Sequence, residues 1–233
     1  MRTQPLEIKQ LSPGAYLTLL LVLLGTFGSI AGGLLNSEML LLVFKPLTML
    51  ILIVWAALMR RRSPGRLHTG IFVGLLFSVV GDILLIWPER LFIAGLCAFL
   101  CAHIAYITAF SHGAALPIKP VVRLPFIVFA MAMWAVLHQN LGTILKFAVA
   151  VYAIVLVSMA SQAWIWHGHH KKQFSLLAVI GSILFVASDT LIAINRFHTP
   201  LPYASAWILL TYFPAQWLIT ASIAEPGPAL TRE

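Results

Sequence analysis

Long apolar runs alternate along this chain with short segments that carry charge, proline or glycine. Each run has about the length that a helix needs to cross the hydrocarbon core of a bilayer, roughly 20 residues. Lipid offers the backbone no hydrogen-bond partners, and a helix satisfies its own backbone within one segment. The pattern therefore predicts eight transmembrane helices, near residues 15–33, 39–58, 67–87, 91–112, 121–138, 143–163, 174–194 and 203–224.

The composition supports a bundle of such helices and excludes an ordinary soluble domain. Of the 233 residues, 61% are hydrophobic and 9% are charged, which leaves too little polar surface for a water-soluble protein. The first apolar run is longer and richer in Leu than the core of a cleaved signal peptide, so we count it as a helix of the bundle. We expect an all-α, polytopic membrane bundle that forms a single transmembrane domain over residues 1–233.

The positive residues follow membrane topology, so the net charge of +8 does not indicate a nucleic-acid partner. Every second loop is poor in positive residues, and these loops together contain only Arg90 and Arg196. The N-terminus and the other loops contain Arg2, Lys9, Arg60, Arg61, Arg62, Arg66, Lys119, Arg123, Lys171 and Lys172. The positive-inside rule then predicts that both termini are cytoplasmic, and we expect the membrane to be a bacterial inner membrane. The run from His167 to His170 falls in one basic loop, where we expect it to be solvated.

Four charged residues are predicted to lie inside or near the hydrocarbon: Lys45, Asp82, Lys146 and Asp189. Lys146 is near a helix end, from which its side chain can reach the interface. At 1.5 Å per residue, each of the other three lies roughly 8–10 Å below the external interface, so two carboxylates and one ammonium share a layer. A structural ion pair with Lys45 accounts for one carboxylate only. Because an unpaired charge in lipid is costly, the second carboxylate indicates a functional cavity.

The two aspartates have similar surroundings. Gly81 precedes Asp82 and Ser188 precedes Asp189, each after an apolar run. A small residue lets a neighbouring helix approach closely. The aspartates fall on the third and seventh predicted helices, four helices apart, which suits a duplicated four-helix unit in parallel orientation.

Polar side chains on neighbouring helices are candidates for the same site. His103 and Tyr106 are three residues apart on the fourth helix and share a face, and Tyr212 and Gln216 are four apart on the eighth. Ser78 lies one turn before Asp82. We expect these residues, with Ser188, to orient water or to bind hydroxyl groups, although a lone intramembrane histidine is often a structural strut.

Several of these residues form short motifs whose order and spacing resemble the YhhN-like lysoplasmalogenase family. The motifs are Phe44 to Thr48, Gly81-Asp82, Gly95, His103 with Tyr106, Ser188-Asp189, and Tyr212 to Ile219. The resemblance implies an eight-helix membrane hydrolase that cleaves the vinyl ether bond of lysoplasmalogens to a fatty aldehyde and a glycerophospho-ethanolamine or -choline. It also implies that Asp82 and Asp189 are essential. The residues before the first helix and the histidine run depart from the family pattern.

The predicted residues suit that reaction. A vinyl ether is hydrolysed by protonation of its β-carbon, and water captures the resulting oxocarbenium ion. Two carboxylates in a low-dielectric pocket provide one group that keeps its proton and one that stabilises the cation. We therefore expect Asp82 and Asp189 to share these roles in either order, with Lys45 pairing with the ionised carboxylate or holding the head-group phosphate. The expected partners are a lysophospholipid and membrane lipids, and no metal or cofactor is required.

Three other functions use similar residues. An intramembrane aspartyl protease has a Gly-x-Gly-Asp motif, but Val79 occupies the first glycine position. A metal-dependent membrane amidase requires several deep histidines, and only His103 is deep. A proton-coupled transporter of a small or amphiphilic solute is the main alternative, because buried acids with a lysine also serve transport. The helix breaks expected of a transporter, at Pro46 and Pro214, do not coincide with either aspartate.

Overall fold

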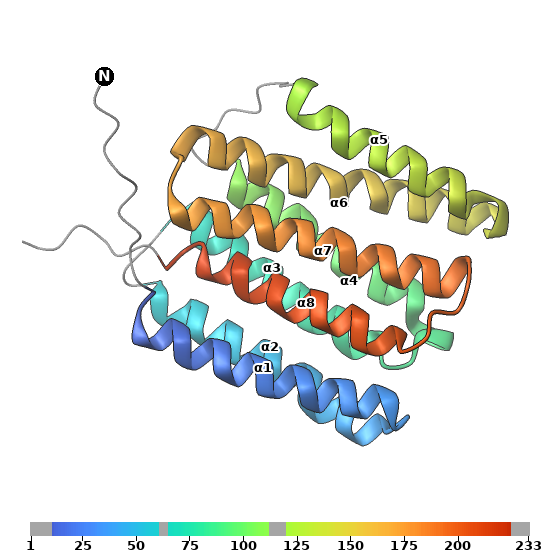
Figure 1. The fold of residues 1–233 in the computed structure, drawn as a ribbon, viewed down its shortest axis with the longest axis horizontal. Helices are drawn as coiled ribbons and strands as arrows, with labels where there is room; N and C mark the ends of the chain where they lie inside the picture. The colour runs from blue at the N-terminus through green and yellow to red at the C-terminus, as the bar shows by residue number, and fades with distance from the viewer. Residues whose placement is uncertain (1–10, 61–64, 112–119, 225–233) are drawn as a thin grey trace, which may run out of the picture.

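Eight α-helices and one short 3-10 helix make up the described residues, 11–60, 65–111 and 120–224, of the computed structural model (Figure 1). In chain order the elements are α1 (Pro13–Leu34), α2 (Glu38–Met59), α3 (Arg66–Leu84), α4 (Pro88–Phe110), α5 (Pro120–Leu137), η1 (His138–Asn140), α6 (Thr143–His170), α7 (Gln173–Phe197) and α8 (Ala204–Ala221). They match the eight predicted apolar runs, which confirms the all-α bundle.

The helices have the character of membrane spans. Seven of those in the described residues are long and apolar enough to cross a bilayer, and large apolar side chains cover much of the exposed surface, as expected where lipid surrounds the bundle. The chain is therefore an integral membrane protein. The remaining helix, α8, packs against α1 and α7 and buries Tyr212, Gln216 and Thr220.

The bundle has two edges and a centre (Figure 1). α1 and α2 form one edge, α5 and α6 form the other, and α3, α4, α7 and α8 lie between them. α5 is the most loosely attached span, because 6% of its apolar window is buried, against 33–44% in the other six spans. α1 begins and α8 ends at the same end of the bundle, on the left in Figure 1.

Equivalent helices of the two halves make equivalent contacts. α3 packs on α4 as α7 packs on α8, and α2 meets α3 as α6 meets α7. Contacts between the halves are also equivalent. The second helix of each half touches the last helix of the other half, α2 with α8 and α6 with α4. The outer helices differ, since α1 packs on α8 whereas α5 packs mainly on α6. The predicted duplication stays a prediction, and this pairing is the pattern that it requires.

The histidine run lies at the end of a helix, so the prediction of a loop was wrong, although Gly168 and His169 are exposed as expected. α6 continues to His170 and ends where Lys171 adopts a left-handed backbone conformation, with φ of 49°. Hydrogen bonds hold this last turn: His167 Nδ1 lies 2.8 Å from Ser175 Oγ, and His170 Nδ1 lies 3.0 Å from the Trp166 carbonyl oxygen. The basic residues Arg2, Lys9, Arg61, Arg62 and Lys119, which the topology prediction uses, lie outside the described residues.

Close packing of α7 on α8 generates a stability prediction. A methyl group on Gly181 would lie 2.8 Å from the Ala215 carbonyl oxygen and 3.0 Å from the Ile219 backbone nitrogen. Because these neighbours are backbone atoms, Gly181→Ala is expected to lower the free energy of unfolding by about 1–3 kcal/mol. The midpoint of thermal unfolding in detergent measures the effect.

The matched control is Gly168→Ala in α6, where an added methyl group meets no atom within 4 Å. Alanine is the better helix former, so this variant is expected to unfold at the same temperature as the wild type or higher. Equal midpoints for the two variants would contradict the tight α7–α8 contact.

Candidate active site

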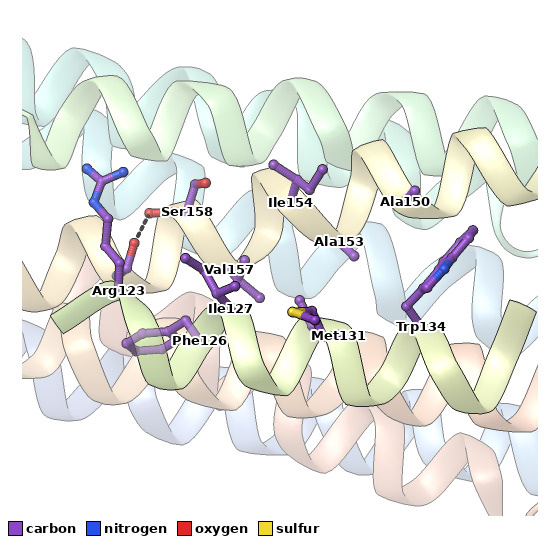
Figure 2. Close-up of a pocket in the computed structure, with 12 residues that line it drawn as sticks. Arg123, Phe126, Ile127, Met131, Trp134, Ala150, Ala153, Ile154, Val157 and Ser158 are labelled. Atoms are coloured by element: carbon purple, nitrogen blue, oxygen red, sulfur yellow. Dashed lines mark hydrogen bonds between the residues drawn. The ribbon is translucent and has the colours of Figure 1, made fainter. Parts of the chain in front are cut away.

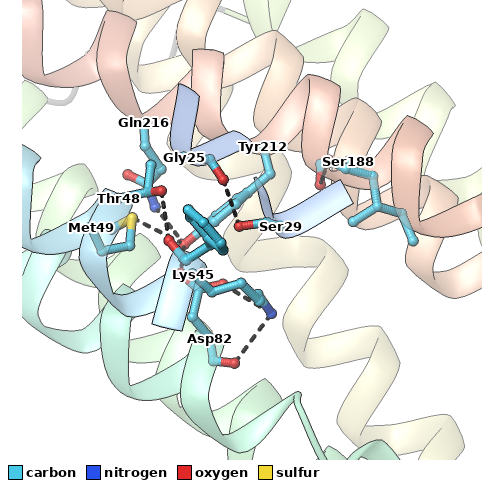
Figure 3. Close-up of polar contacts among 11 residues, drawn as sticks. Gly25, Ser29, Lys45, Thr48, Met49, Asp82, Ser188, Tyr212 and Gln216 are labelled. Atoms are coloured by element: carbon cyan, nitrogen blue, oxygen red, sulfur yellow. Dashed lines mark hydrogen bonds and ion pairs between the residues drawn. The ribbon is translucent and has the colours of Figure 1, made fainter. Parts of the chain in front are cut away.

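Asp82 is buried among three helices near the end of α3. Its Oδ1 lies 3.4 Å from the ammonium nitrogen of Lys45 on α2, and Lys45 also donates to the Asp82 carbonyl oxygen at 3.2 Å (Figure 3). Tyr212 of α8 donates its hydroxyl proton to Asp82 Oδ2 at 2.6 Å. Both partners of the carboxylate are therefore donors, and the exposed fraction of Asp82 is 2%. The predicted pairing of Lys45 with one aspartate is present, and its partner is Asp82.

A chain of hydrogen bonds extends from Asp82 through the bundle core. Gln216 Nε2 donates to the Tyr212 hydroxyl at 3.2 Å, and Tyr106 donates to Gln216 Oε1 at 2.7 Å. Ser78 Oγ lies 3.5 Å from the Tyr106 hydroxyl. The sequence thus predicted four polar residues that gather in one network, which connects α3, α4 and α8. Since each of these donors points along the chain toward Asp82, the network stabilises an acceptor there.

Asp189 of α7 has a second set of partners, on α4 and α6. Tyr152 donates its hydroxyl proton to Asp189 Oδ2 at 2.6 Å, and His103 Nε2 lies 3.2 Å from the same oxygen. The His103 and Tyr152 side chains also approach each other at 3.0 Å. Among the described residues, no hydrogen bond reaches Asp189 Oδ1, and the fully buried His103 Nδ1 has no partner. Asp189 is thus held through one oxygen only.

The two carboxylates do not form one joint pair. Phe185 lies between their partners, with its ring centroid 5.4 Å from that of Tyr212 and 4.7 Å from that of His103. Phe99 packs edge-on against both Phe185 and Tyr212. Among the described residues no hydrogen bond connects Asp82 with Asp189, so each aspartate belongs to its own cluster.

The clusters are built alike in the two halves of the chain. Lys45 stands 37 residues before Asp82, and Tyr152 stands 37 residues before Asp189. Each aspartate also takes a partner from the last helix of the other half, Tyr212 on α8 or His103 on α4. Sequence reasoning missed Tyr152, and the repeated spacing is the signal that indicates it.

Ser188 has a packing role rather than a place in either cluster. Its hydroxyl donates to the Ile208 carbonyl oxygen on α8 at 3.2 Å (Figure 3). Gly81 likewise makes room for a neighbour, because a methyl group there would lie 2.6 Å from the Phe99 ring. Both small residues allow helices to approach, as predicted from their positions before the aspartates.

Asp189 borders two small apolar cavities, whereas Asp82 borders none of the cavities described below. The first, of about 50 Å³, lies between α4, α6 and α7 and includes Phe92, Phe99 and Tyr152 in its wall. The second, of about 60 Å³, lies between α5, α6 and α7. Asp189 is therefore the carboxylate that a reactant in these cavities would meet. Within the described part of the chain, no three His, Cys, Asp or Glu side chains gather as a metal site.

A longer apolar groove adjoins the second cavity. It runs between α5 and α6 from Trp134 to Arg123 and has a volume of about 360 Å³ (Figure 2). Ala130, Ala153 and Val157 line both the groove and the cavity beside Asp189. The groove thus adjoins the Asp189 cavity on the α5–α6 side of the bundle.

A third cavity lies at the end of the bundle that carries the α3–α4 and α7–α8 connections. Its volume is about 280 Å³, and Lys45 and Arg196 are in its wall. Leu85, Phe92 and Ile192 line both this cavity and the first cavity beside Asp189. The cavities therefore adjoin one another in order, from the one lined by two cations, through the two beside Asp189, to the apolar groove.

Comparison with known proteins gives consistent matches. The model of the YhhN family matches residues 40–223, which include every residue of both clusters. The lysoplasmalogenase TMEM86A of Bos taurus is 33% identical over 168 residues, 67% of this chain and 66% of that protein. The lysoplasmalogenase TMEM86B of Sus scrofa is 35% identical over 151 residues, 65% of this chain and 62% of that protein. A lysoplasmalogenase of Mycobacterium tuberculosis is 29% identical over 224 residues, 91% of this chain and 79% of that protein.

The matches to the two mammalian relatives cover slightly less than two thirds of those proteins' own length. No solved structure matches the chain.

The buried ion pair generates a prediction about stability. Lys45→Met leaves the Asp82 carboxylate without its cation and is expected to lower the free energy of unfolding by about 3 kcal/mol. Adding Asp82→Asn removes the charge that is left, so the double variant is expected to recover much of the loss. Thermal unfolding of the single and double variants in detergent measures both effects. Additive destabilisation would contradict the pairing.

Proposed function

The chain belongs to the YhhN family, and we propose that it is a membrane hydrolase that cleaves the vinyl ether bond of lysoplasmalogens. Relatives named lysoplasmalogenases support the substrate class. The observation that carries the proposal is Asp189, at the border of two apolar cavities. Tyr152 and His103 fix one of its carboxylate oxygens, and no other described residue forms a hydrogen bond with the second. A vinyl ether needs such a positioned acid.

We assign the role of general acid to Asp189. Tyr152 and His103 both contact Oδ2, so a proton on Oδ1 would point to a reactant without breaking either contact. Donation of that proton to the β-carbon of the vinyl ether forms a C–H bond and leaves an oxocarbenium ion beside the new carboxylate. The opposite charges are close together in a site of low dielectric constant, where the attraction is strong.

Water completes the reaction and restores the acid. It attacks the carbon that carries the ether oxygen and gives a proton to the Asp189 carboxylate. The resulting hemiacetal then breaks its bond to the glycerol oxygen, which releases a fatty aldehyde and the glycerophospho alcohol. Asp189 donates one proton and receives one from water, so the cycle consumes only the lipid and one water molecule.

Asp82 is the second carboxylate of the proposed site, with an electrostatic role. The Lys45 ammonium and the Tyr212 hydroxyl both donate to it, which is the arrangement expected around an anion. Asp82 thereby holds the Lys45 ammonium at the wall of the cavity of about 280 Å³. Tyr106, Gln216 and Ser78 act through Tyr212, because their hydrogen bonds fix its hydroxyl.

The α5–α6 groove is the proposed site of the hydrocarbon chain. Its wall is apolar over most of its length, and it adjoins the Asp189 cavity at Ala130, Ala153 and Val157. α5 has little buried surface, so opening this side of the bundle disrupts few contacts. A single-chain lipid would therefore enter from the bilayer without first passing through water.

The orientation follows from the positive-inside rule. We infer that the α2–α3, α4–α5 and α6–α7 connections and both termini are cytoplasmic, in a bacterial inner membrane. Arg60, Arg66, Lys171 and Lys172 lie at that end of the bundle. The cavity lined by Lys45 and Arg196 is then at the external end, because Arg196 lies in the last turn of α7 and α4 begins at Pro88 there.

The first test is aldehyde release from an alkenyl lysophospholipid by the purified protein in detergent. The wild type is expected to release aldehyde, and in D₂O one deuterium is expected on the carbon beside the aldehyde carbon. Asp189→Asn removes the acid and is expected to lower kcat by about a thousandfold. Asp82→Asn is expected to lower kcat less and to raise KM, because Lys45 loses its partner.

The control is Glu38→Gln, an identical change of charge at an exposed carboxylate, which is expected to retain full activity. Folding of each variant is checked by thermal unfolding. Wild-type turnover by Asp189→Asn would refute the assigned acid. No aldehyde from folded wild-type protein, together with solute flux in sealed vesicles, would favour the proton-coupled transporter.

The groove gives a separate prediction about chain length. Ala153→Phe places a ring where the groove meets the Asp189 cavity and is expected to lower kcat/KM for a long alkenyl chain at least about tenfold. A short-chain substrate is expected to react normally. Val151→Phe, on the same helix but in neither cavity wall, is the control. Equal losses for both chain lengths would place the chain elsewhere.

A further inference from the structure

The cavity of about 280 Å³ has polar side chains in its wall that the proton transfers proposed at Asp189 do not use. Besides apolar side chains, it is lined by Lys45, Asn195, Arg196 and Ser205. Two of these four are cations, and they come from different helices, α2 and α7. No carboxylate is in the wall of this cavity. A cavity with two cations and no carboxylate in its wall suits an anion.

Each cation is already positioned by a partner outside the cavity wall. Lys45 is held by the buried Asp82, and Arg196 forms an ion pair with Glu89 at the start of α4. Arg196 also lies over the Phe92 ring, 5.4 Å from its centroid. The Glu89 side chain is 80% exposed and that of Arg196 is 31% exposed, so exchange of this partner for another anion costs little.

The position of this cavity fits one end of a lysophospholipid. Leu85, Phe92 and Ile192 separate it from the cavity that contains Asp189, and each of them lines both. In an alkenyl lysophospholipid only the glycerol carbons separate the vinyl ether from the phosphate. When the vinyl ether lies beside Asp189, the phosphate must therefore lie in an adjoining cavity.

We propose that Lys45 and Arg196 form a binding subsite for the phosphodiester of a single-chain ether lipid. A phosphate oxygen accepts from the Lys45 ammonium, and the Arg196 guanidinium, in exchange for Glu89, donates to the phosphate through its fork of N–H groups. The inference rests on the proposed function, because the vinyl ether at Asp189 sets where the phosphate lies. The subsite implies that tight binding of the lipid to the protein requires the phosphate.

Binding of an unreactive analogue tests the subsite without turnover. The probes are a saturated 1-O-alkyl lysophosphatidylethanolamine and the matching 1-O-alkylglycerol, which has no phosphate. Arg196→Gln in the full-length protein is expected to bind the phospholipid about tenfold more weakly, and to bind the alkylglycerol like the wild type. Equal affinity changes for the two lipids would overturn the subsite.

Glu89→Gln is the matched control, because it breaks the same ion pair and keeps the guanidinium. It is expected to bind the phospholipid as tightly as the wild type or more tightly. Equal weakening by Glu89→Gln and Arg196→Gln would show that the ion pair acts by joining α4 to α7, which overturns the proposal. Glycerophosphoethanolamine without a chain is expected to bind far more weakly than the lipid. Equal binding would identify a site for free phosphate esters instead.

The two proposals fail separately. Phosphate-dependent binding by a protein that releases no aldehyde would leave the subsite in place and refute the hydrolase. Aldehyde release with the same KM in the wild type and Arg196→Gln would leave the hydrolase in place and refute the subsite.

Discussion

A carboxylate inside hydrocarbon must be compensated by neighbouring groups, and this requirement organises the centre of the bundle. Asp82 draws together α2, α3 and α8 through the Lys45 ammonium and the Tyr212 hydroxyl. Asp189 draws together α4, α6 and α7 through His103 and Tyr152. Six helices are thus tied by two acidic side chains, because in lipid an unpaired charge or hydrogen-bonding group is far more costly than in water. Contacts between small residues and backbone, such as Gly181 against α8, then let those helices meet.

The sequence predicts those features of the fold that a lipid environment requires of a membrane-spanning chain. Helix number follows from the length of each apolar run, and Lys45, Asp82 and Asp189 are conspicuous because charge is rare in such runs. Tyr152 escaped prediction because a tyrosine in an apolar run has no distinguishing charge. Depth along a helix also says nothing about position across the bundle, so two aspartates in one layer were expected as a pair, whereas Phe185 lies between their partners. The loose attachment of α5 was not predictable for the same reason, because the side chains of several helices together decide which helices become neighbours.

The two clusters occupy equivalent places but differ in chemistry. The partner that comes 37 residues before the aspartate in the chain is a lysine for Asp82 and a tyrosine for Asp189. The second partner is Tyr212 in one cluster and His103 in the other. At Asp82 a cation and a hydroxyl engage both carboxylate oxygens, which closes the site. At Asp189 both partners among the described residues engage one oxygen, and the proposed reaction uses the other. Two changes of residue type at matching positions thereby distinguish a carboxylate paired with a cation from the carboxylate that we propose as the acid.

The order of the cavities matches the order of polarity along a single-chain ether lipid. Cations line the cavity at one end, Asp189 lies in the middle, and the α5–α6 groove is apolar. A small polar solute in transit would need a polar path across the bundle, whereas this set of cavities turns sideways to the lipid face at Ala153 and Val157. The loosely packed α5 forms that face, from which the proposed substrate would enter. Asp189 lies where the polar and apolar cavities meet, and in the proposed substrate the ether bond is likewise the junction of head and tail.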